Sequence, residues 1–350
     1  MASRALAFSD PEVIRLASTA FVSIADNCSN LQRQQDPEGD FFRLVAEQGH
    51  YGGRTHPSDT RQGQYACTPD GRLLASINTR EGPRMIAMLR LALEQWEAWR
   101  AGAAHEVPAE PTPASIAEGK TARVGGTTLR VDPRFLRRPP EGGMVLRVFA
   151  RDVLPREHDE RPVDWRTHAV NHDHAWFRAE ELPAFLPQPA VPGATATLPE
   201  ALARRLVRFH LIDNVRGETP MWRAEDVQQA EVRTTIAGAD GDRLRVRLEG
   251  RFRCASAGSW AIRPFGEHQP RTERGFEGRI LGQMTWDRTA ARPIAFEAIA
   301  CGNRWGGSEH NCRYEDLDPA PMGVLFELAD GTAPGDAIPP QGVGWGDYWG

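Results

Sequence analysis

Three histidines lie within seven residues near the middle of the chain, in the segment 167–176, which reads THAVNHDHAW. Side chains of a strand alternate between its two faces, so an extended segment points His168, His172 and His174 to the same side. In a helix only His168 and His172 would share a face. A His-x-His pair on a strand lets two imidazoles converge on one ion, and imidazole suits zinc, copper, iron and nickel. The spacing therefore predicts a transition-metal site, with histidines that are solvated or bonded to the backbone as the alternative.

Two further groups could assist a metal ion bound at that site. Asp173 or Asp164 could accept a ring N–H and so fix the tautomer of a ligating histidine. His210 lies at the end of a helix that Pro199-Glu200 begin, just before the irregular stretch 213–218, and such junctions often carry functional residues. Capping of the helix C-terminus is the alternative role for His210. We expect Asp173 and His210 to be catalytic residues.

A third fragment, CGNRWGGSEHNC, spans Cys301 to Cys312 and contains His310. His310 and Cys312 would share a strand face, but the fragment lacks the Cys-x-x-Cys spacing of a structural zinc site. Buried thiols with a surface histidine are the alternative. The predicted metal ligands are His168, His172, His174 and His310, and the predicted ion is copper or iron, with zinc as a further option.

Familiar catalytic motifs are absent from the chain. We find no GxSxG, GxxxxGK[ST] or HExxH, and no GxGxxG after a strand. The closing residues, QGVGWGDYWG, are rich in glycine and aromatics. We expect a frayed chain end there, with docking over a pocket mouth as the alternative.

The first hundred residues carry a different candidate, Cys28. Residues 21–25 (FVSIA) read as a buried strand that ends just before Cys28, and a helix is predicted from Asp36-Pro37-Glu38 to about Gly49. A hairpin over 64–77 and an amphipathic helix after Pro83 follow.

This order of elements resembles the C-terminal part of a thioredoxin-like fold. The resemblance implies a reactive Cys28 at a helix N-terminus, where the dipole lowers a thiol pKa. The family's second cysteine would fall at Leu31, so the resemblance implies a single-cysteine role or a scaffold. A small buried apolar side chain is the alternative role for Cys28.

The organisation of the chain follows from its composition. At 350 residues the chain is longer than one hydrophobic core usually accommodates, so we expect two domains. Residues 101–119 are rich in Ala, Pro and Glu, a composition typical of a linker. We expect a thioredoxin-like domain over 1–100, a linker over 101–119 and a β-rich domain over 120–350. Strand patterns dominate the last part, so the predicted fold class is α+β, with a mainly antiparallel curled sheet or open barrel and one or two helices. The predicted strands are 127–131, 144–149, 227–236, 244–254, 276–286, 294–300 and 323–328.

Net charge, hydropathy and cysteine content limit the classes of partner that we expect for this chain. The formal net charge is -5 and 25% of residues are charged, so electrostatics gives no reason to expect nucleic acid as the main binding partner. No run of about 18 apolar residues occurs, and the N-terminus lacks the apolar core of a signal peptide. Five widely spaced cysteines do not form a disulfide framework. We expect a cytoplasmic protein with a small-molecule substrate and neither nucleic acid nor membrane as a partner.

Three functions remain open from the residues alone. The first is a metal-dependent enzyme, an oxidoreductase rather than a hydrolase, with its site in the β-rich domain. The second is a non-catalytic protein that binds a small molecule in an apolar pocket, lined by Trp286, Trp305, Trp345 and Trp349. The third is a single-cysteine thiol protein centred on Cys28.

Overall fold

The computed structural model of the chain divides into two compact units, residues 1–138 and 139–350. Residues 102–119 of the predicted linker lie outside the described residues. The residues that the structure describes are 7–8, 10–26, 28–32, 36–50, 61–79, 81–101, 122–124, 127–129, 138–153, 169–217, 219–262, 269–332, 334–341 and 347–349.

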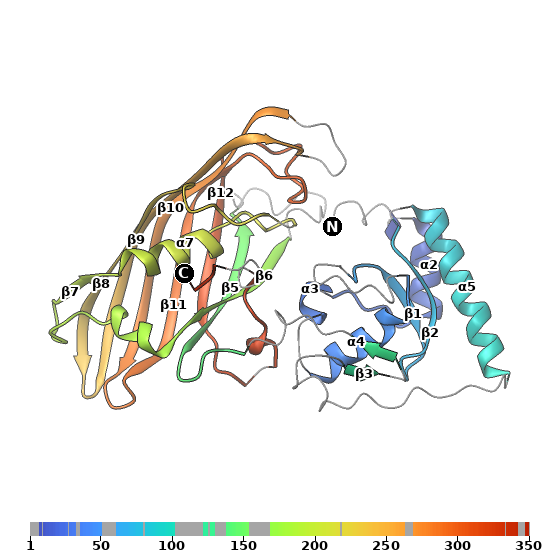
Figure 1. Cartoon of the computed structure of the whole chain (residues 1–350), viewed down its shortest axis with the longest axis horizontal. Coiled ribbons are helices and arrows are strands. Elements are labelled where there is room, and N and C mark those ends of the chain that lie inside the picture. Colours follow the sequence, from blue (N-terminus) through green and yellow to red (C-terminus); the bar gives the residue numbers. More distant parts are fainter. Residues whose placement is uncertain are drawn as a thin grey trace. The chain divides into compact units, whose positions relative to one another are not determined.

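Unit 1 contains one long helix and several shorter ones beside a small hairpin (Figure 1). The helices are α2 (Pro11–Ala20), α3 (Cys28–Leu31), α4 (Pro37–Glu47) and α5 (Gly82–Arg100). The hairpin joins β1 (Gln64–Cys67) to β2 (Leu73–Ile77), and a second hairpin joins β3 (Ala122–Val124) to β4 (Thr127–Leu129).

Local sequence signals explain where α2 and α4 begin. The Asp10 carboxylate accepts a hydrogen bond from the backbone N–H of Glu12 at 2.9 Å, and Asp36 accepts one from Gly39 at 2.9 Å. A proline follows each cap at the first helical position. The predicted helix start at Asp36, the predicted hairpin over 64–77 and the predicted helix after Pro83 are confirmed.

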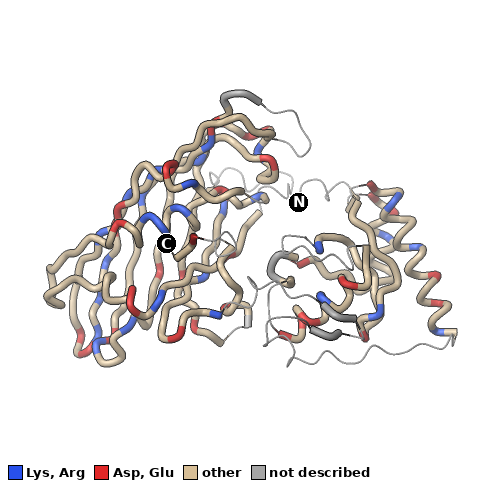
Figure 2. Tube along the Cα trace, viewed as in Figure 1, with Lys and Arg blue, Asp and Glu red and all other residues tan. Residues whose placement is uncertain are grey.

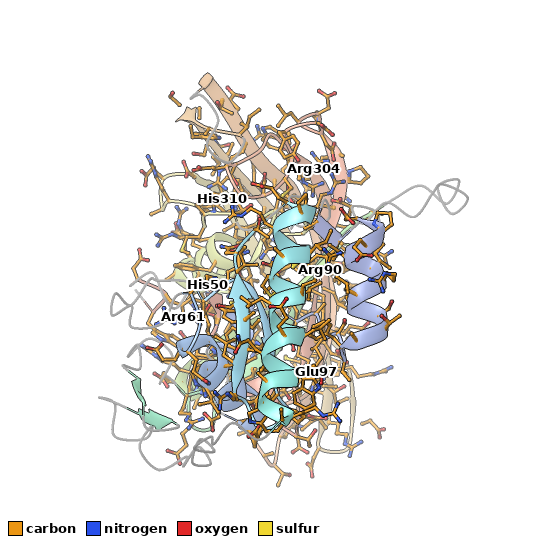
Figure 3. All side chains as sticks on the ribbon, turned by 90° about the vertical axis from the view of Figure 1, so that its right-hand side faces the viewer. His50, Arg61, Arg90, Glu97, Arg304 and His310 are labelled. Atoms are coloured by element: carbon orange, nitrogen blue, oxygen red, sulfur yellow. The ribbon has the colours of Figure 1, made fainter. Side chains whose placement is uncertain are left out.

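The core of unit 1 lies between α5, α2 and the first hairpin. It contains Met85, Met88, Leu89 and Ala92 of α5, with Val13 and Leu16 of α2 and Ala66 and Ala75 of the hairpin. On the outside, the Arg90 guanidinium of α5 lies 3.0 Å from the Glu12 carboxylate of α2 (Figure 3). Apolar packing and this ion pair hold the two helices together.

The strand predicted over residues 21–25 is wrong. Residues 22–26 have no regular structure, and the side chains of Val22 and Ile24 are 92% and 82% exposed. A strand needs a partner and a surface to pack on. The described strands of unit 1 pair only within their own hairpins, so this segment has neither.

Unit 2 is built on an eight-stranded antiparallel sheet in the order β6-β5-β12-β11-β10-β9-β8-β7. Its strands are β5 (Met144–Asp152), β6 (Val170–Phe177), β7 (Thr195–Thr197), β8 (Val227–Asp240), β9 (Arg243–Trp260), β10 (Gln269–Asp287), β11 (Arg292–Trp305) and β12 (Ala320–Leu328). The order ends at β6 and β7, which do not pair with each other in the described residues, so the sheet is open. The predicted α+β class with a large, mainly antiparallel sheet is confirmed at this level.

One face of the sheet is covered by helices. α7 (Glu200–His210) lies across the strands in Figure 1. Unit 2 also contains the 3-10 helices η4 (Ala179–Phe185) and η5 (Pro334–Ala337). Leu202 and Val207 of α7 and Phe185 of η4 pack on the inner face of the sheet. Along β9, Leu244, Val246 and Leu248 are buried, whereas Arg243, Arg245 and Arg247 are exposed. Figure 2 shows such charged positions recurring along the long strands.

No helix in the part of the chain that the structure describes is long and apolar enough to cross a membrane.

Candidate functional site

The predicted histidine segment forms β6, the last strand at one end of the sheet. Among the described strands, β6 pairs only with β5, with His172 opposite Phe149 and His174 opposite Arg147. The two histidines therefore lie on one face of an extended strand, as predicted. His168 lies outside the described residues.

The imidazoles of His172 and His174 are neighbours. Their ring centres are 4.8 Å apart, and His172 stacks on Phe149 with an interplanar angle of 6°. His174 is 1% exposed, and His172 is half-buried. The Nε2 atoms of both rings are buried and have no hydrogen-bond partner among the described residues. Such atoms are rare in native proteins because an unpaired buried polar group is costly.

Burial also sets the charge of the two rings. Desolvation lowers the pKa of His172 and lowers that of His174 to about 4. Both imidazoles are therefore neutral near pH 7, and a neutral imidazole nitrogen has the lone pair that a metal ion needs. The pair can thus accept a hydrogen bond or bind a cation.

A second polar group lies where β6 meets α7. The Asp173 carboxylate is 3.7 Å from His210 Nδ1, which is longer than a hydrogen bond, so it acts on the ring as a nearby charge. The Asp173 carboxylate also accepts the backbone N–H of Gln341 at 2.9 Å. Burial alone would raise the pKa of Asp173, but the His210 imidazole and backbone N–H groups outweigh it and hold the pKa below its usual value.

Tyr348 completes this group. Its hydroxyl lies 2.9 Å from His210 Nε2 and accepts the backbone N–H of Trp176 at 3.0 Å. Burial raises the pKa of Tyr348, so the phenol stays protonated and can donate to His210 Nε2. His210 Nδ1, on the other side of the ring, faces the Asp173 carboxylate. The arrangement is an Asp–His–Tyr chain of which two members, Asp173 and His210, were predicted as catalytic residues.

The sequence did not single out Tyr348. The chain end that we expected to fray is instead packed into unit 2, because Tyr348 is buried against Trp176 and Phe209. The sequence feature that could have indicated a packed chain end is the aromatic pair Tyr348-Trp349, because its large apolar area favours burial.

A buried network of charges fixes the loop that follows α7. The Arg313 guanidinium pairs with Asp152 at 2.7 Å and with Asp213 at 2.7 Å, and Arg216 pairs with Asp152 at 2.7 Å. Asp316 lies 2.9 Å from Arg216 and also pairs with Arg304. Burial alone would raise the pKa of Asp152, but Arg313 and Arg216 hold it below its usual range. The network ties the end of α7, and with it His210, to β5.

The other predicted site residues do not join the histidine pair in the described residues. His310 is exposed, and its nearest ionisable partner is Glu309 at 3.8 Å (Figure 3). Cys301 is exposed and Cys312 half-buried, and both thiols are free. Cys28 belongs to unit 1, where it begins the single turn of α3 and its thiol donates to Gln32 Oε1 at 2.9 Å.

The tryptophans proposed to line one pocket are separated. Trp305, the last residue of β11, lies opposite Gly275 of β10, whereas Trp286 lies near the far end of β10, opposite Pro293. The eleven residue-to-residue steps from Gly275 to Trp286 span about 37 Å of strand. Trp286 and Trp305 therefore do not line the same pocket. Trp345 lies outside the described residues.

Within the described residues, no group of three or more His, Cys, Asp and Glu side chains is arranged to hold a metal ion. No family model matches the chain, and no curated protein or solved structure matches it. Function must therefore be argued from the histidine pair and its surroundings.

Proposed function

We propose that unit 2 binds a transition-metal ion through Nε2 of His172 and Nε2 of His174, and that it is a metal-dependent enzyme. The observation that carries the proposal is that both nitrogens are buried without a hydrogen-bond partner in the described residues. A bound ion would supply the missing partner of both atoms.

The separation of the rings supports this proposal. Imidazole nitrogens bind zinc at about 2.0–2.1 Å, so two rings on one ion have centres roughly 4.5–5.2 Å apart for angles of about 90–109° at the metal. The observed separation of 4.8 Å lies within that range. The stacking of His172 on Phe149 fixes the orientation of one ring before an ion binds.

Two protein ligands leave coordination positions open. We expect His168 to be the third ligand on sequence spacing alone, and a water or substrate molecule to occupy a further position, as in catalytic zinc sites. The Asp173–His210–Tyr348 chain begins at the residue between the two ligands, on the opposite face of β6. Redox chemistry at copper or iron remains the predicted reaction type.

The proposal is tested by titrating the metal-free protein with Zn²⁺ and with Cu²⁺ in a calorimeter. We expect the variant His174→Gln to lose at least about 100-fold in affinity, more than the 10–100-fold typical of a residue behind a ligand. The matched control is His310→Gln, which removes an exposed histidine. Equal affinities for the wild type and both variants would exclude His174 as a ligand.

A further inference from the structure

A row of apolar side chains crosses the outer face of the sheet in unit 2, the face opposite to the one on which α7 packs. Four neighbouring strands contribute one residue each, and these are Phe149 of β5, Leu325 of β12, Ile299 of β11 and Leu281 of β10 (Figure 1). Each residue lies directly opposite the next in the strand register. The preceding residues Val148, Ala298 and Ile280 belong to the core, so alternation points the row away from it. We call these four residues the apolar row.

Much of the apolar row is open to solvent. Leu281 is 55% exposed and Ile299 is 42% exposed, whereas Phe149 and Leu325 are half-buried. Val170 of β6, on the same face, is 54% exposed. An antiparallel sheet with one face in water normally carries polar side chains on that face. A contiguous apolar patch in that position is typical of a surface that binds a partner.

Charged side chains of opposite sign border the apolar row, each two residues from the row along its strand. One border contains Arg151 of β5 and Arg279 of β10, and the other contains Glu327 of β12 and Glu297 of β11. Glu327 and Glu297 lie directly opposite each other, an arrangement that is unfavourable for like charges. All four side chains are exposed, and none forms an ion pair with another residue that the structure describes.

A second copy of the chain would supply counter-charges for both borders. When two sheets face each other at about 10 Å with a two-fold axis along the apolar row, row lies on row. The rotation exchanges the two borders, so the arginine border of one copy faces the glutamate border of the other. Arg279 then lies one strand spacing, about 4.8 Å, from the strand that carries Glu297 in the second copy, and Arg151 has the same relation to Glu327. A two-fold axis along the strands would instead place arginine on arginine, so the charge pattern selects one orientation.

From this pattern we propose that the outer face of the sheet is the interface of a symmetric homodimer. The four strands of the row cover about 19 Å across the sheet and, with nine residues in β5 and in β12, about 30 Å along it. The face therefore offers about 570 Å² per copy, which fits a weak dimer at the low end of specific interfaces. The inference is independent of metal binding at the histidine pair.

The test is sedimentation velocity of the full chain at concentrations up to about 100 µM, at low and at high ionic strength. We expect a monomer–dimer equilibrium that weakens at high ionic strength, because salt screens exposed charges. Ile299→Lys should raise the dissociation constant at least about tenfold, because it places a charge in an apolar interface. The matched control is Val191→Lys, which changes a residue that is 49% exposed and precedes β7, at the opposite end of the sheet order.

Charge reversal tests the orientation of the two copies. Arg279→Glu and Glu297→Arg should each raise the dissociation constant about tenfold at low ionic strength, and the double variant should restore it to within about threefold. Both residues are exposed, so the variants retain the fold, which circular dichroism checks. A wild type that stays monomeric throughout would overturn the dimer and leave the face to a different partner. A dimer that Ile299→Lys leaves intact, or a double variant no tighter than the single ones, would overturn the proposed interface.

Discussion

His210 Nε2 and the Tyr348 hydroxyl lie 2.9 Å apart in the interior of unit 2, although 138 residues separate them in the chain. The contact joins the end of α7 to the end of the chain. It also completes a line of polar groups from Asp173 through His210 to Tyr348, so its strength is the first quantity to measure.

We expect Tyr348→Phe to lower the free energy of unfolding by about 1–3 kcal/mol, because it leaves His210 Nε2 and the Trp176 N–H unpaired in the interior. Urea denaturation measures this loss. A double-mutant cycle with His210→Phe should give a coupling energy of about 0.5–3 kcal/mol. Additive effects of the two substitutions would show that the hydrogen bond contributes nothing.

The buried charge network predicts a larger effect. Arg313→Leu leaves Asp152 and Asp213 without their shared partner, and breaking a buried pair in this way costs about 3–5 kcal/mol. The control is Arg251→Leu, on the exposed face of β9, where a change within about 0.5 kcal/mol is expected. Equal urea midpoints for the two variants would contradict a stabilising role for the network.

Burial of His174 predicts that stability depends on pH. The pKa of His174 is about 4 in the folded protein and 6.5 as its ordinary value, so between these values the unfolded chain binds a proton that the folded chain does not. Stability therefore rises with pH across this window. The contribution of His174 reaches about 3 kcal/mol, since one pKa unit corresponds to about 1.4 kcal/mol.

The variant His174→Phe removes this contribution, and His310→Phe serves as the control because its side chain is exposed. Urea unfolding of the metal-free proteins between pH 4.5 and 6.5 should show a shallower slope for His174→Phe alone. Equal slopes for His174→Phe and the wild type would mean that His174 is solvated rather than buried.

The helices and strands of both units were predicted well where the periodic pattern of apolar residues ran along the whole element. Alternation along Leu244, Val246 and Leu248 identified β9, but residues 255–260 (ASAGSW) extend the strand without such alternation. Small residues carry little hydrophobic signal, so the end of this strand was predicted too early. Residues 21–25 show the reverse: an apolar run favoured a strand, but strand formation also requires a partner that the sequence does not specify.

The candidate site was predictable only in its local part. His172 and His174 share a face because side chains alternate along any strand, whatever the tertiary fold. The contact of Asp173 with His210 depends on how α7 crosses the sheet, and that of His210 with Tyr348 on the path of the chain end. The spacing of residues in the sequence predicts neither of these long-range contacts. For this reason Tyr348, Asp152 and Arg313 were not singled out.

The central claim is that His172 and His174 bind a metal ion. Elemental analysis of freshly purified protein, beside a variant with both residues changed to Ala, tests it directly. We predict near-stoichiometric copper, iron or zinc in the wild type and none in the variant. Absence of all three metals from the wild type after incubation with each ion and desalting, or equal metal content in both proteins, would contradict the claim.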